Sequence, residues 1–105
     1  MSTEATKENA PLAGEARQEK LCELREQFRG NEVHQQEPRL LAALNLFPVS
    51  TLEARRYLDM PHPAGRVASL RRKGWRIETL MIRERTEAGV PHSFALYVLR
   101  GGQHE

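Results

Sequence analysis

A chain of 105 residues allows at most one domain with tails. No run approaches the roughly 18 apolar residues of a membrane-spanning helix, and a polar N-terminus with a single cysteine, Cys22, predicts a cytoplasmic protein without secretory signal, membrane contact or internal disulfide. The net charge of +2 is unevenly divided: residues 48–105 carry ten Lys/Arg against six Asp/Glu, which favours a polyanion as partner, with an ordinary solvated surface as the alternative.

The first part of the chain is predicted to be a tail and an accessory helix. Residues 1–14 are rich in Ser, Thr, Glu and Lys, and we expect them to be disordered. Residues 15–35 are expected to form a helix and a linker, with Leu21, Leu24 and Phe28 in one narrow apolar stripe. That stripe packs on the domain, frays, or serves as the surface for a homodimer or another protein partner.

The first helix of the core is predicted to begin after Pro38. The preceding stretch, residues 31–37, is polar and is interpreted as a linker. Residues 39–47 carry the densest apolar helical pattern in the chain, and Pro48 ends it. This pattern predicts a core helix.

Capping residues and prolines define the next two helices. Ser50 and Glu53 have the spacing of a capping box, which predicts a short helix over residues 51–58. Two prolines stop that helix. The second, Pro63, suits the first position of a third helix, which ends before Gly74.

The third helix separates into two sides when its residues are placed at about 100° each. The apolar side contains Ala64, Val67, Ala68 and Leu70. The polar side, expected to point outward, contains Gly65, Arg66, Ser69, Arg72 and Lys73. Arg71 falls on the apolar side near the end, with a stem that packs and a head that reaches solvent.

Beyond the third helix the apolar period changes to that of β-structure. Residues 75–83 and 92–100 predict the two strands of a hairpin, and the polar residues 84–91 its turn. Both strands are apolar at nearly every position, so either face of the hairpin remains a candidate for the inner one. Residues 101–105 are a tail. Core packing is expected for Trp75, Phe94 and Tyr97.

This order of elements over residues 36–100 resembles the winged helix-turn-helix domain, and within it a small group found in bacterial and phage genomes. The second helix matches at Leu52-Glu53-Ala54, the third at residues 66–75, and the wing strands at Ile77 and at residues 97–99. The group often has glycine after the second helix, where this chain has Asp59. Asp tolerates the left-handed region, so the turn is retained. The resemblance implies an α+β fold: a three-helix winged helix-turn-helix core with a C-terminal β-hairpin wing, preceded by an extra N-terminal helix and a tail.

The resemblance also implies double-stranded DNA as the partner, with the third helix in the major groove, and a role as a small transcriptional or phage-type regulator. Candidate base-reading residues are His62, Gly65, Arg66 and Ser69. Candidate phosphate-binding residues are Thr51, Arg72, Lys73, Arg83 and Arg85. For His62 the alternative is a turn residue that caps the helix.

The sequence contains little that indicates catalysis. The four histidines and the cysteine lack metal-ligand spacing, and no glycine-rich phosphate loop follows a strand. We therefore expect no enzyme, no metal and no cofactor. The alternative function is that of a protein-interaction adaptor that does not bind DNA, since one fold serves many functions.

Overall fold

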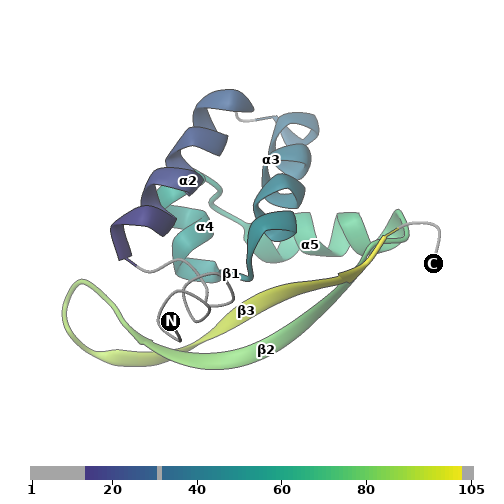
Figure 1. Cartoon of the computed structure of the whole chain (residues 1–105). Coiled ribbons are helices and arrows are strands. Elements are labelled where there is room, and N and C mark those ends of the chain that lie inside the picture. The colour runs from purple at the N-terminus through teal and green to yellow at the C-terminus, as the bar shows by residue number, and fades with distance from the viewer. Residues whose placement is uncertain (1–13, 31, 103–105) are drawn as a thin grey trace, which may run out of the picture.

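The computed structural model of the chain describes residues 14–30 and 32–102, in which four helices lie on one side of a long β-hairpin (Figure 1). The elements in chain order are α2 (Gly14–Gln27), α3 (Val33–Leu46), β1 (Val49–Ser50), α4 (Thr51–Tyr57), α5 (Pro63–Arg72), β2 (Arg76–Arg85) and β3 (Pro91–Gly101). The predicted α+β architecture with a hairpin wing is confirmed. Most of the predicted N-terminal tail, residues 1–13, and the end of the C-terminal tail, residues 103–105, lie outside the described residues.

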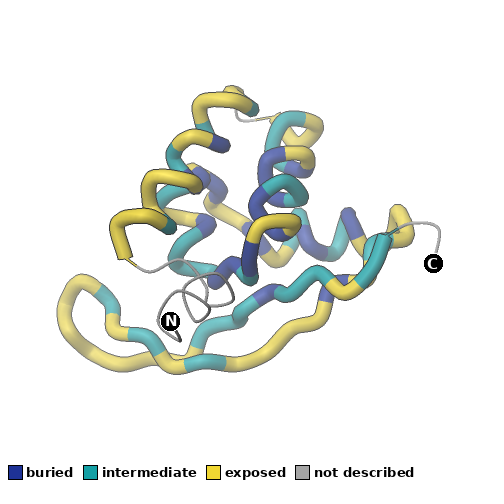
Figure 2. The backbone as a smooth tube through the Cα atoms, in the orientation of Figure 1, coloured by how far each residue is buried: buried dark blue, intermediate teal, exposed yellow. Residues whose placement is uncertain are grey.

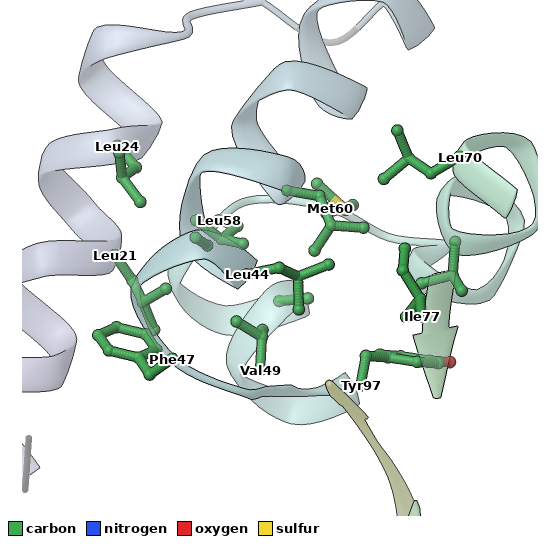
Figure 3. Close-up of a cluster of buried hydrophobic side chains, with 14 residues drawn as sticks. Leu21, Leu24, Leu44, Phe47, Val49, Leu58, Met60, Leu70, Ile77 and Tyr97 are labelled. Atoms are coloured by element: carbon green, nitrogen blue, oxygen red, sulfur yellow. The ribbon is translucent and has the colours of Figure 1, made fainter. Parts of the chain in front are cut away.

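Helix α2 packs on the domain through its apolar stripe. Leu21 and Leu24 are buried in the same cluster as the core residues of the other elements (Figure 3). Phe28 is partly buried and is packed against that cluster. Of the alternatives given for this stripe, the structure shows the one in which it packs on the domain. Burial of such apolar side chains provides the main free energy that holds α2 in place.

Helix α3 begins six residues earlier than its apolar pattern, residues 39–47, indicates. It runs from Val33 and contains Pro38 in its second turn, so the predicted linker over residues 31–37 is wrong from Val33 onward. Proline costs the helix one backbone hydrogen bond. The residues on either side of it, Glu37 and Arg39, compensate with tertiary bonds, since both are buried and hydrogen-bonded to other helices.

Arg39 joins the ends of two other helices to α3. Its guanidinium donates to the carbonyls of Phe28 (2.8 Å from Nε) and Gly30 after α2, and to the carbonyl of Leu58 after α4 (2.7 Å). Carbonyls at helix C-termini have no partner within their own helix, so one side chain satisfies groups at two helix ends. Burial lowers the pKa of Arg39, and the nearby charge of Asp59 opposes that effect.

The segment from α4 to α5 follows its predicted capping pattern. Ser50 Oγ accepts from the Glu53 amide (3.1 Å), and Glu53 Oε1 accepts from the Ser50 amide (3.1 Å), which completes the capping box. Asp59 has a φ of 54°, the left-handed conformation expected for the position where glycine is frequent. Pro63 occupies the start of α5, and Gly74 ends the turn after it with a φ of 102°.

The sheet is antiparallel, with strand order β1-β3-β2. The two-residue strand β1, absent from the sequence-based prediction, pairs Val49 with Tyr97. Ile77 and Tyr97 are buried beneath the helices, whereas the middle and tip of the hairpin are largely exposed (Figure 2). The face that includes Ile77 and Tyr97 is therefore the inner one at the base of the wing. Phe94 was expected in the core, but it is only half-buried and lies edge-on to His92.

Candidate nucleic-acid interface

Helix α5 is held on three sides. Pro63, Val67 and Leu70 are buried in the core, as predicted for Val67 and Leu70. The two flanks of this buried stripe contact α3 and β2 respectively. The orientation of α5 about its own axis is therefore fixed, and with it the set of side chains that points away from the domain.

The flank toward α3 carries three residues that were expected to point outward. Arg66, Ser69 and Lys73 follow helical spacings of three and four, so they share one side of α5. Ser69 Oγ donates to Glu37 Oε2, and Lys73 Nζ lies 2.5 Å from Glu37 Oε1. The Nε of Arg66 is buried and, among the described residues, has no hydrogen-bond partner. The prediction that this whole polar set faces away from the domain is therefore wrong.

Glu37 is the charged centre of this flank. Burial raises the pKa of its carboxyl, but the hydrogen bonds from Lys73 and Ser69 and the charges of Lys73 and Arg66 outweigh burial and hold the pKa below its ordinary value. Sequence reasoning missed this residue because it lay in the predicted linker. A signal was present: Glu37, Leu40 and Leu44 have helical spacings of three and four, which extends the buried stripe of α3 by one turn.

The other flank is tied to β2. Arg71 donates from Nε and Nη2 to the carbonyl of Ile77 (2.8 and 2.5 Å) and from Nη2 to Thr79 Oγ1 (2.8 Å). Arg71 is exposed, as expected, and its head also connects the end of α5 to the first residues of the wing. A guanidinium with several fixed donors is suited to such a role.

Between the two flanks lies the outward strip of α5, formed by the half-buried Gly65 and Ala68 and the exposed Arg72. Ala64 and Ala68 were expected on the apolar side, but Ala64 is exposed and Ala68 is not part of the buried stripe. Arg72 is exposed and makes no hydrogen bond or ion pair with the described residues. A Cβ placed on Gly65 would meet no atom within 4 Å, so the space in front of this residue is open. His62, just before the helix, is exposed and makes no capping bond through its side chain.

The wing supplies the remaining candidates. Arg83 and Arg85 lie two residues apart on β2 and so on one face of the hairpin, opposite Ser93 and Pro91 of β3. Arg85 donates to the carbonyl of Gly89 across the tip (2.7 Å), whereas Arg83 is exposed and makes no such contact with the described residues. The tip lies far from the C-terminal end of α5 (Figure 1).

Thr51, at the start of α4, is directed toward the sheet. Its Oγ1 lies 3.4 Å from the carbonyl of Ala95, and the side chain is half-buried. The structure thus places the candidate residues in four separate regions: the start of α4, the outward strip of α5 with His62, the wing, and the α3 flank of α5.

The described part of the chain was also searched for metal sites, membrane-spanning helices and grooves. Residues 14–30 and 32–102 hold no group of three or more His, Cys, Asp or Glu side chains placed to bind a metal ion. None of the described helices has the length and apolar character needed to cross a membrane. A groove of about 270 Å³ opens between α3 and the end of α5, lined by His34, Glu37, Pro38, Leu41, Leu70, Lys73 and Trp75.

Comparison with known proteins bears on the whole of this region. Residues 35–101 match a family model described as a winged helix-turn-helix domain. That match covers α3 almost entirely, the helix-turn-helix pair α4 and α5, and both long strands of the wing. A search of curated proteins and a search of solved structures each gave no match.

Proposed function

The chain belongs to the winged helix-turn-helix family, and we propose on this premise that it binds double-stranded DNA with α5 in the major groove. DNA binding is the general property that membership of this family suggests. The excess of basic residues in the second half of the chain agrees with a polyanion as partner.

One observation supports this mode above others: the outward strip of α5 is open in front of Gly65 and ends in Arg72, which has no hydrogen-bond or ion-pair partner among residues 14–30 and 32–102. Gly65 and Ala68 carry little bulk, so the helix backbone is able to approach the base edges closely. A major groove about 12 Å wide admits one α-helix. Arg72 then lies where the helix leaves the groove, in a position suited to phosphate.

The proposed contacts divide by the chemistry of each side chain. His62 and Gly65 are assigned to base edges. Arg66 is assigned there too, because arginine pairs with guanine, although its Nε is buried on the α3 flank. Arg72 and Arg83 are assigned to phosphates, which set affinity and register and carry no sequence information. Arg85 and Thr51 are weaker assignments of the same kind, because each has a hydrogen bond within the domain.

The biological role that fits DNA binding by this domain is that of a small transcriptional or phage-type regulator without enzymatic activity. The adaptor alternative gave the stripe of Leu21, Leu24 and Phe28 as a possible docking surface. Leu21 and Leu24 are buried in the core, which favours DNA binding over that alternative.

Selection from a random duplex library, followed by titration of the selected duplex at two salt concentrations, tests the proposal. We expect binding that weakens steeply with salt. Gly65→Glu places a carboxylate on the outward strip without a steric clash and should abolish binding. Gln18→Glu adds the same charge on the exposed side of α2 and should not. An absence of duplex binding by the unaltered chain at both salt concentrations would disprove the proposal.

A further inference from the structure

We infer that Glu37 is a positioning residue that keeps Ser69 and Lys73 away from DNA, so that α5 meets DNA with the strip of Gly65, Ala68 and Arg72. This inference rests on the proposed DNA binding. It specifies which part of the basic surface of α5 contacts DNA. Two of the nine residues expected to contact DNA, Ser69 and Lys73, are thereby assigned to contacts within the protein.

The geometry of the carboxylate supports this assignment. Each oxygen of Glu37 has its own donor from α5, Ser69 on Oε2 and Lys73 on Oε1. The side chain of Glu37 is only 6% exposed, whereas that of Lys73 is 58% exposed. The lysine stem therefore lies at the surface while its charged end turns back toward α3.

The ammonium of Lys73 binds Glu37, and moving it to a phosphate has a cost in stability. The buried carboxylate of Glu37 would keep only the hydrogen bond from Ser69 and the charge of Arg66, and removing one partner of a buried ion pair is destabilising. A surface phosphate contact mainly releases condensed counterions, and water screens it. Between these two partners the buried carboxylate is the stronger one for Lys73.

Arg72 provides the contrast that makes the inference testable. It is the neighbour of Lys73 in the chain and equally basic, but it makes no hydrogen bond or ion pair with the described residues and lies on the outward strip. Charge and sequence position alone would assign both residues the same role. The packing of α5 on α3 separates them.

The experiment compares the salt dependence of duplex binding for Arg72→Ala and Lys73→Ala in the full chain. Each lost phosphate contact reduces the slope of log K against log salt by about 0.9. We expect that reduction for Arg72→Ala and an unchanged slope for Lys73→Ala. An equal reduction in both variants would show that Lys73 contacts DNA and would overturn the inference.

Glu37→Gln tests the same idea in the opposite direction. The amide keeps the shape of the side chain but removes the charge that holds Lys73 at α3, so the slope should become steeper by about 0.9. A loss of stability alone would not produce that change. An unchanged slope in a variant with an unaltered circular dichroism spectrum would also overturn the inference. If either Glu37→Gln or Lys73→Ala does not fold, the other variant decides. If the unaltered chain binds no duplex, the proposed function itself has failed, which is a distinct result.

Discussion

The guanidinium of Arg17 in α2 binds both carboxylate oxygens of Glu53 in α4, each at 2.7 Å. Arg17 also donates to the carbonyl of Pro48 (2.6 Å) and lies over the ring of Phe47, 4.2 Å from its centroid. Glu53 is the same residue that closes the capping box of α4. One ion pair therefore joins the accessory helix to the first helix of the helix-turn-helix pair.

Replacing either partner should destabilise the domain. Glu53→Ala removes the bidentate pair and the capping box together, and we expect a loss of about 2 kcal/mol in the free energy of unfolding. Urea denaturation followed by circular dichroism measures it. Lys20→Ala is the matched control, since Lys20 forms only an exposed pair with Glu23 at 3.7 Å and should change stability by less than about 0.5 kcal/mol. Equal effects in the two variants would contradict the role given to Glu53.

Any substitution of Arg39 should destabilise the domain, because no other side chain has a planar guanidinium with several fixed hydrogen-bond donors. Arg39→Lys leaves at least one of three helix-end carbonyls unpaired, and we expect a loss of about 3 kcal/mol. Arg29→Lys, on an exposed residue, serves as the reference. Thermal unfolding of both variants gives the comparison, and a similar Tm for the two would show that Arg39 is not needed as a cap.

Glu37 should make stability depend on pH in the acid range. Because its pKa is lower in the folded state, its stabilising contribution is fully present above the ordinary value of 4.5 and is lost as the pH falls through the folded-state value. The urea midpoint of the unaltered chain should therefore fall more steeply with acid than that of Glu37→Gln. Parallel profiles for the two proteins between pH 6 and about pH 3 would disprove this link.

Asp59 carries a measurable backbone cost. Its φ of 54° is unfavourable for any residue with a Cβ, so Asp59→Gly should be more stable than Asp59→Ala by about 1 kcal/mol. Both variants remove the same carboxylate next to Arg39, so their difference isolates the backbone effect. Chemical denaturation of the two variants measures this difference in stability. Equal denaturation midpoints for Asp59→Gly and Asp59→Ala would contradict the prediction.

The wing should contribute affinity without sequence preference. Arg83→Ala should weaken binding to all duplexes alike and reduce the salt slope by about 0.9. Arg100→Ala is the control, because Arg100 pairs with Glu78 (2.7 Å) at the base of the hairpin. Fluorescence anisotropy with two unrelated duplexes distinguishes the variants. A loss confined to one duplex would assign Arg83 to base reading.

Local chemistry made much of this fold predictable. The capping box of Ser50 and Glu53, the proline at the start of α5 and the glycine after it each act within a few residues, so their consequences were readable from the sequence. The same holds for the left-handed turn at Asp59. By contrast, β1 has two residues, too few for any period to be detected.

The remaining errors share one physical cause, which is tertiary contact. Pro38 indicates a helix boundary locally, but the bonds of Glu37 and Arg39 extend α3 through it. Likewise, polar residues flank the buried stripe of α5 on both sides, and a helical projection does not say on which side α3 lies. The roles of Ser69 and Lys73 depended on that choice.

Trp75 gives the groove between α3 and α5 an optical property. It is the only tryptophan in the chain, it is half-buried, and it lines that groove together with Glu37 and Lys73. Indole emission responds to the polarity and charge of its surroundings. Any event that breaks the Glu37–Lys73 pair, such as acid, substitution or capture of the lysine by a phosphate, therefore occurs beside a native fluorophore, and a single unlabelled sample reports it directly.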